Sequence, residues 1–167
     1  MKKILTLIFA ALTFTVAASS QIKLGHINSA ELMRLMPELE EAELELQAHN
    51  RELEEMSRTM ITEYENLVNE FQANQQQWSE LIRNTRVRAI QDLETRIQEF
   101  RQSSERTFEQ KREDLFSPII EKARAAIEEV AKEHKYTYIF DTSGGTLLYS
   151  AESDNVMELV KKKMDLK

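Results

Sequence analysis

The chain contains no cysteine, which excludes disulfide bonds and the lipid-modified cysteine of a lipoprotein. It has only three glycines and two prolines in 167 residues. A compact globular domain of this length needs more turns than these residues provide. Charged residues make up 31% of the chain, and Glu, Arg and Lys dominate them. That balance is typical of long helices and coiled coils.

A basic excess is also missing, because the formal net charge is −7. It becomes −9 if Lys2 and Lys3 are removed with an N-terminal leader. Nucleic-acid binding requires a basic stripe, so no nucleic-acid partner is expected. The acidic balance also makes direct binding to an anionic membrane doubtful.

The N-terminus predicts a signal peptide over residues 1–20. A short positive stretch precedes an uncharged apolar run at residues 4–16, and the small residues Ala18 and Ser20 fit a signal-peptidase site. The apolar run is shorter than the roughly 20 residues that span a bilayer. We therefore expect export to the periplasm and cleavage near Ser20, with a retained membrane anchor as the alternative.

Residues 37–117 predict a long helical hairpin. This segment has no glycine, and its one proline, Pro37, suits the first turn of a helix. The polar stretch at residues 74–79 lies near the midpoint and marks the expected reversal, whereas an unbroken rod of about 120 Å is the alternative. Apolar or small residues recur at steps of mostly three and four on both sides of it, as amphipathic helices require: Leu39, Ala42, Leu46, Leu53, Met56, Met60, Tyr64, Leu67, Phe71 and Trp78, then Ile82, Ala89, Leu93, Ile97, Phe100, Ser104, Phe108 and Leu115.

The two arms of this hairpin differ in charge. Residues 37–77 carry eleven glutamates and two arginines, which gives −9. Residues 78–117 carry eight acidic and eight basic residues, which gives 0. Flanking charges of this kind are compatible with antiparallel pairing of the arms, and they are equally compatible with two solvated faces.

The two ends of the chain, residues 21–36 and 118–167, predict one small head. In its N-terminal part we expect a strand at residues 22–28 and a short helix at residues 30–36 that Ser29 caps. A head with so few strands and no disulfide rarely stands alone, and its strand edges would be exposed. Self-association is therefore expected.

The C-terminal part of the head predicts a helix, a β-hairpin and a second helix. The first helix, residues 118–134, continues the return arm, and Pro118 is expected to bend it. A strand, a turn and a partner strand are expected at residues 136–141, 142–145 and 146–150. Asp154 or Asn155 is expected to cap the last helix, which has Val156, Leu159, Val160 and Met164 on one face.

No group of residues predicts catalysis. The histidines His26, His49 and His134 have no metal-ligand spacing with one another, and the chain contains no phosphate-binding loop or nucleophile motif. We expect no enzyme activity, no cofactor and no metal.

Taken together, the ends of the chain resemble the Skp/OmpH family of periplasmic outer-membrane-protein chaperones. The resemblance covers the whole chain after the signal peptide. The segments that carry it are Lys23 to Asn28 with Ser29 to Met36, Ala126-Ile127-Glu128-Glu129-Val130-Ala131, Tyr138-Ile139-Phe140-Asp141, Leu148-Tyr149-Ser150, and Asp154-Asn155-Val156 with Leu159-Val160.

The resemblance implies an α+β, mostly α fold in which a long antiparallel coiled-coil hairpin is inserted in a small β-containing head. The head would form a homotrimer through a central β-barrel. Such a trimer would act as an ATP-independent holdase, which holds unfolded outer-membrane proteins in a cavity between the helical arms and prevents their aggregation. The competing class is a non-chaperone structural coiled-coil protein of the cell envelope.

Two sets of candidate residues follow. The candidate client-contacting residues are apolar or aromatic and lie on the first arm or at its tip: Met56, Met60, Ile61, Tyr64, Val68, Phe71 and Trp78. The candidate oligomer interface comes from the expected strands of the head: Leu24, Ile27, Tyr138, Phe140 and Leu148.

For some of these residues a structural reading competes with contact to a client. Ile61 and Val68 lie beside the apolar stripe, so they can face a client or widen the packing of the hairpin. Trp78 can anchor the turn, or it can touch clients or the membrane. The basic residues that follow the tip, Arg83, Arg86 and Arg88, can simply form a solvated face.

Overall fold

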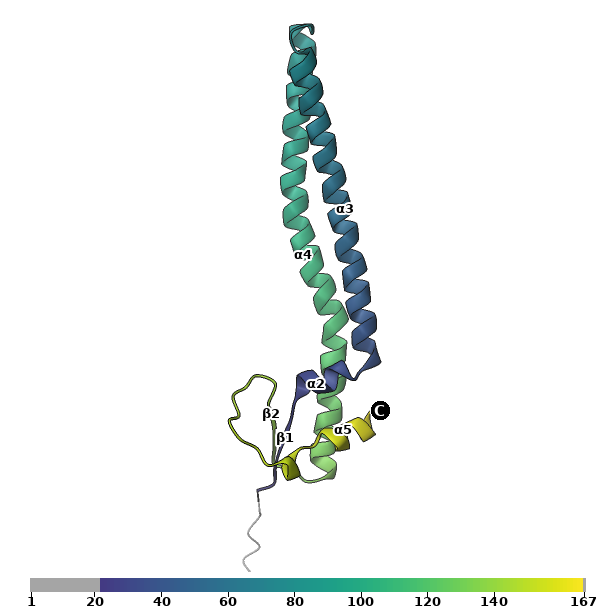
Figure 1. Ribbon diagram of the computed structural model, residues 1–167, viewed down its shortest axis with the longest axis vertical. Coiled ribbons are helices and arrows are strands. Elements are labelled where there is room, and N and C mark those ends of the chain that lie inside the picture. Colours follow the sequence, from purple (N-terminus) through teal and green to yellow (C-terminus); the bar gives the residue numbers. More distant parts are fainter. Residues whose placement is uncertain (1–21, 167) are drawn as a thin grey trace, which may run out of the picture.

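The computed structural model describes residues 22–166. Figure 1 shows two long helices that project side by side from a small head, in which both ends of the described chain lie. The predicted signal peptide, residues 1–20, falls outside the described residues. The elements follow the order β1 (Leu24–Ile27), α2 (Ser29–Arg34), α3 (Pro37–Asn74), α4 (Glu80–Glu133), β2 (Tyr138–Asp141), the 3-10 helix η1 (Glu152–Asp154) and α5 (Met157–Lys163).

The chain reverses between α3 and α4 without glycine or proline. Helix α3 ends at Asn74 and α4 begins at Glu80, so the turn falls within the polar stretch where the sequence predicts it. The side chain of Ser79 accepts a hydrogen bond from the backbone N–H of Ile82 at 3.4 Å and caps the new helix. The middle of the chain is therefore a hairpin and not a single rod.

The two arms pair in an antiparallel register that ion pairs mark at three levels. Glu38 pairs with Lys122, and Glu45 pairs with Lys111. Nearer the tip, Glu70 Oε1 lies 3.2 Å from Arg86 Nη2. These pairs are exposed and each stabilises the hairpin by about 1 kcal/mol at most. The apolar seam between the helices contributes more, and Ala42, Leu93 and Ile97 are buried in it.

The return arm and the head helix are one continuous helix, because α4 extends for 54 residues through Pro118. Proline has no backbone N–H, so the carbonyl of Asp114 loses its usual helical partner. Figure 1 shows α4 following a curved course toward the head. The buried residues of its last part recur every three or four positions and form the centre of the head: Ile119, Ala123, Ala126 and Val130.

Both ends of the chain pack on this part of α4. From the N-terminal end, Ile27, Leu32 and Met36 are almost completely buried. From the C-terminal end, Val156 and Val160 are completely buried. These residues share one hydrophobic core with the buried face of α4. The head therefore exists only when both ends of the chain meet on α4.

The sheet of the head is a parallel pair, β1 with β2, in the register Leu24↔Tyr138 to Ile27↔Asp141. The expectation of a β-hairpin between residues 136–141 and 146–150 is wrong. Residues 142–145 do form a turn, in which Gly145 donates its N–H to the carbonyl of Thr142 at 3.2 Å. Residues 146–150, however, form no strand, and β2 pairs with β1 instead because Ile139 then packs against the core beside Ile27.

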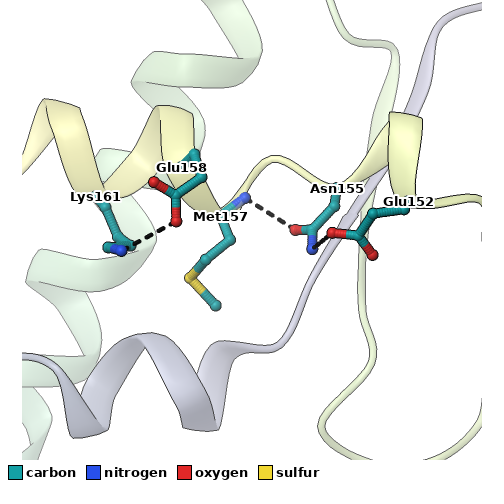
Figure 2. A network of polar contacts seen from close by, with 5 residues as sticks. All are labelled: Glu152, Asn155, Met157, Glu158 and Lys161. Atoms are coloured by element: carbon teal, nitrogen blue, oxygen red, sulfur yellow. Dashed lines mark hydrogen bonds and ion pairs between the residues drawn. The ribbon is translucent and has the colours of Figure 1, made fainter.

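Of the two expected helix caps, the one at Ser29 is wrong, and the one at Asp154 or Asn155 is confirmed for Asn155. Asn28, not Ser29, caps α2, because its side chain accepts a hydrogen bond from the N–H of Glu31 at 3.1 Å. At the start of α5, Asn155 rather than Asp154 makes the capping bond. Its Oδ1 accepts from the N–H of Met157 at 3.0 Å, while its Nδ2 donates to Glu152 at 2.9 Å (Figure 2).

Gly25 allows strand β1 to approach the core closely. A Cβ atom at this position would lie 3.0 Å from Tyr136 Cε1 and 3.0 Å from Val156 Cγ1. We expect Gly25→Ala to lower the free energy of unfolding by about 1–3 kcal/mol, because the ring or the strand must move. Urea denaturation followed by circular dichroism measures this change.

Gly144→Ala is the matched control for Gly25→Ala. A Cβ at Gly144 meets no atom within 4 Å, so we expect a change of no more than about 0.5 kcal/mol. Equal unfolding curves for the two variants would contradict the close packing of β1.

Candidate functional site

Part of one face of the two-stranded sheet is apolar and exposed. Tyr138 and Phe140 of β2 point away from the core, and their ring centroids are 6.3 Å apart. Leu24, which pairs with Tyr138 across the sheet, is exposed on the same face. The loop after β2 adds more apolar surface, and its Leu148 is 98% exposed. We refer to Leu24, Tyr138, Phe140 and Leu148 as the head patch.

Ile27 does not belong to the head patch. It was expected at the oligomer interface with the other four residues, but its side chain is only 2% exposed. Successive side chains of a strand point to opposite faces, so Ile27 faces the core when Leu24 faces solvent. Its contribution is to the stability of the head itself.

The outer edge of β2 lies next to the head patch. Strand β1 is flanked by β2 on one side and by a bridge from His26 to Asn155 on the other. Within residues 22–166, β2 has no strand neighbour other than β1. An open edge beside exposed aromatic side chains is a surface to which another strand can add.

Asp141 fixes the end of β2 to the start of α2. Its Oδ1 accepts hydrogen bonds from the backbone N–H groups of Ser29 at 3.1 Å and Ser143 at 2.9 Å. Its Oδ2 accepts from the hydroxyl groups of the same two serines. Partial burial raises the pKa of Asp141, but these four hydrogen bonds lower it further, so the pKa is about 2.

The candidate client-contacting residues lie along one arm and at the tip, but none is fully buried. Met56 is 48% exposed. The other six are half-buried: Met60, Ile61, Tyr64, Val68, Phe71 and Trp78. Because these side chains are only half-buried in the hairpin, α3 keeps apolar surface that another molecule can contact.

Trp78 anchors the turn. Its ring meets Phe71 of α3 edge to face, with centroids 6.0 Å apart. The guanidinium of Arg86 from α4 also lies over the Trp78 ring, 5.5 Å from its centroid. Trp78 therefore connects the two helices at the tip, as one of its two predicted interpretations required.

Further apolar residues are exposed that were not predicted to be so from the sequence. Leu81 and Ile82, in the first turn of α4, are exposed at the tip. Leu147 and Tyr149 are exposed beside Leu148 in the loop after β2. Two adjacent apolar residues in the first turn of a helix cannot both face one seam, which is the signal that could have revealed Leu81 and Ile82.

The histidines do not converge. His26 Nε2 lies 3.0 Å from the carbonyl oxygen of Ala151 and joins β1 to the segment before η1. His49 lies on the arm, and His134 follows the end of α4. In the described part of the chain, no three side chains of the metal-binding types gather into a possible metal site.

The arms and head match a family model, described as "Outer membrane protein (OmpH-like)", over residues 23–164. The chain belongs to the OmpH-like family. This confirms the resemblance inferred from the two ends of the sequence. A comparison with curated proteins found no match.

A solved structure has the same OmpH-like fold. It is the crystal structure of a candidate outer membrane chaperone (OmpH-like) from Caulobacter crescentus CB15. The two chains superpose with a TM-score of 0.73 at 12% sequence identity, and the match covers 86% of this chain and 84% of that one. At that identity, the likeness concerns the fold.

Within residues 22–166 of this OmpH-like chain, no helix has both the length and the apolar character needed to cross a membrane.

Asp141→Asn tests how the OmpH-like head is held together. The pKa of Asp141 in the folded chain, about 2, lies below its ordinary value of 3.8. Its carboxylate therefore stabilises the fold fully above about pH 4, and this stabilisation is lost as the pH falls through about 2. We expect Asp141→Asn to lower the free energy of unfolding by about 1 kcal/mol at pH 7, because the site is partly exposed, and to match the unsubstituted chain below about pH 2.

Chemical denaturation at a series of pH values measures this effect. Asp114→Asn, on the exposed surface of α4, removes the same charge where no such hydrogen bonds hold it, and it is the control for the loss of stability at pH 7. A stability difference for Asp141→Asn that persists undiminished below pH 2 would contradict the assignment.

Proposed function

We propose that this chain is an ATP-independent periplasmic holdase, which binds unfolded outer-membrane proteins between its arms and keeps them from aggregating. Membership of the OmpH-like family is the observation that carries this proposal. The similar solved structure, described as a candidate outer membrane chaperone, supports it. The predicted signal peptide supports export to the periplasm.

The arms have the surface that a holdase needs. Such a protein must bind many apolar sequences weakly and release them without an energy source. Half-exposed methionines suit this task, because their flexible and polarisable side chains adapt to different partners. Met56 and Met60 are of this kind, and Ile61 and Val68 extend the same apolar surface beside the seam.

We propose that three copies associate through their heads. The head patch and the open edge of β2 supply an apolar surface and unpaired backbone groups at the same place. Addition of strands from neighbouring copies would satisfy both, and a closed barrel would remove the exposed edges. Three hairpins on one side of such a barrel would enclose the cavity in which clients are held.

A structural coiled-coil protein of the envelope would share the long hairpin. It would have no need for apolar residues that remain half-exposed along the arms, and it would not hold unfolded proteins. The two functions therefore differ in a measurable activity.

Suppression of aggregation separates them. When an unfolded outer-membrane β-barrel protein is diluted out of urea, light scattering reports its aggregation. We expect equimolar trimer to suppress most of this scattering without ATP. Ile61→Ala combined with Val68→Ala should remove about half of the suppression and leave the melting temperature unchanged, because these half-buried side chains would contact the client.

Leu44→Ala is the control for this double variant. Leu44 is an exposed apolar residue of the same helix, and it lies two residues, or about 200°, from buried Ala42 in the seam. It should suppress aggregation normally. A double variant that melts at a lower temperature yet still suppresses aggregation would assign Ile61 and Val68 to hairpin packing alone.

Phe140→Glu tests association through the head patch. A charge placed among buried aromatic groups at an interface is costly, so we expect the trimer to dissociate at least about tenfold more readily. Analytical ultracentrifugation measures the mass, and circular dichroism checks that the subunit is still folded. Leu44→Glu introduces the same charge at an exposed site on the arm and should remain trimeric; a trimer that survives Phe140→Glu would exclude the head patch as the interface.

A further inference from the structure

The methionines of this chain differ sharply in their exposure to solvent. Among residues 22–166, Met56 is the only methionine with an exposed side chain, and it is 48% exposed. Met36 and Met157 are buried in the head, where they are 1% and 8% exposed. The remaining methionines of the described chain are half-buried: Met33, Met60 and Met164. One thioether is therefore much more open to solvent than the others.

Met56 is also distant from the surfaces that the head uses. It lies about 28 Å along α3 from Pro37, the first residue of that helix. The arm projects away from the head (Figure 1), so association through the head patch leaves this part of α3 uncovered. Met60 follows Met56 by one turn, and both belong to the apolar surface to which we assign client binding.

An accessible thioether reacts with peroxides. Hydrogen peroxide transfers one oxygen atom to the sulfur: a sulfur lone pair forms the new S–O bond, the O–O bond breaks, and the second oxygen leaves as water with both protons. The sulfur is oxidised by two electrons and the peroxide is reduced by two. The product is methionine sulfoxide, which is polar where the thioether was apolar.

The charge of the arm favours an uncharged oxidant. Residues 37–77 have a net charge of −9, and the Glu52 side chain, one turn before Met56, is 71% exposed. Anionic oxidants are repelled from such a surface, whereas hydrogen peroxide is neutral at pH 7. Because Met56 is half in water already, its sulfoxide oxygen can stay hydrated, and the hairpin can remain folded after oxidation.

We propose that Met56 is a site of reversible oxidation by hydrogen peroxide, and that its sulfoxide weakens the binding of unfolded clients to the arm. The inference rests on the proposed holdase function and adds a regulation to the same surface. The polar sulfoxide removes an adaptable apolar contact from that surface. Its exposure also lets a methionine sulfoxide reductase restore the thioether, as a dithiol supplies two electrons and two protons and the oxygen leaves as water.

Mass spectrometry after brief peroxide treatment of the full chain measures which methionine reacts. Trypsin cleaves after Arg51 and Arg58, so Met56 and Met60 fall on different peptides, and every other methionine of residues 22–166 also has a peptide of its own. We expect Met56 to be oxidised at least about fivefold faster than Met157, because reactivity follows the exposure of the sulfur. A rate for Met56 no higher than that for Met157 would exclude the site.

A bound client should shield this sulfur. We expect an unfolded outer-membrane β-barrel protein, added before the peroxide, to slow oxidation of Met56 at least about threefold. Met164 is the internal control, because it packs against the head core, and its rate should not change. Undiminished oxidation of Met56 in the complex would show that the client leaves Met56 uncovered and would overturn the regulation.

The aggregation assay connects the modification with holding. We expect about threefold more of the oxidised chain to be needed for half-suppression at an unchanged melting temperature, because one half-exposed side chain supplies only part of the apolar contact. A methionine sulfoxide reductase with dithiothreitol should restore the original value. Met56→Gln, which places a polar group on a side chain of similar length, should behave like the oxidised chain without peroxide.

Met56→Leu assigns the effect to this residue. Leucine keeps an apolar side chain of similar volume and has no sulfur, so this variant should suppress aggregation normally before and after peroxide. Met33→Leu is the matched control, because it removes a half-buried methionine of the head and should lose suppression on oxidation as the unsubstituted chain does. Equal losses in Met56→Leu and Met33→Leu would place the effect at another residue.

The two functions fail in different ways. If the untreated chain suppresses aggregation and complete oxidation of Met56 leaves suppression unchanged, the regulation is wrong and the holdase function stands. If the untreated chain does not suppress aggregation, the holdase function is wrong, whatever the rate at which Met56 is oxidised.

Discussion

The parallel pairing of β1 with β2 is the constraint on which the rest of this structure depends. Parallel neighbours cannot be joined by a tight turn and need a crossover connection. Here that connection is the complete sequence of α2, α3 and α4, so the arm is the crossover itself and not an appendage of the head. The strands pack against a core that contains Ile27 from one end of the chain and Val156 and Val160 from the other.

The arm is stabilised by the burial of apolar side chains between its helices more than by its ion pairs. Its ion pairs are exposed and individually weak, whereas the seam buries Leu93 and Ile97. The seam is not uniform, because the small polar residues Ser57 and Ser104 interrupt the apolar pattern. His49, about two turns from Ser57 on α3, has a buried ring nitrogen without a hydrogen-bond partner among residues 22–166. The two helices are therefore less tightly packed in the middle of the hairpin than a fully apolar seam would allow, which is compatible with a role of this region in binding.

Helical periodicity was sufficient to predict both arms and the polar turn between them, since each signal is local. The composition around Tyr138 and Phe140 likewise predicted β2. The partner of β2 could not be predicted in this way, because Leu24 and Tyr138 are far apart in the sequence and no local pattern joins them. The segment from Thr146 to Ser150 has the composition of a strand, and composition does not reveal whether a partner lies within reach.

The continuity of α4 gives the molecule a mechanical property. Its 54 residues run from the turn beside Trp78 to the core beside Val130, a length of about 80 Å. In the proposed function, the helix that would lie beside a bound client at its far end also forms the centre of the head at its near end. A sideways force on the tip acts as a torque on residues Ile119 to Val130 of α4 in the head. Strands β1 and β2, which pack on this part of the helix, would tilt with it. If a client lies between the arms as proposed, its binding and release would therefore place strain on the part of the head where subunits would join.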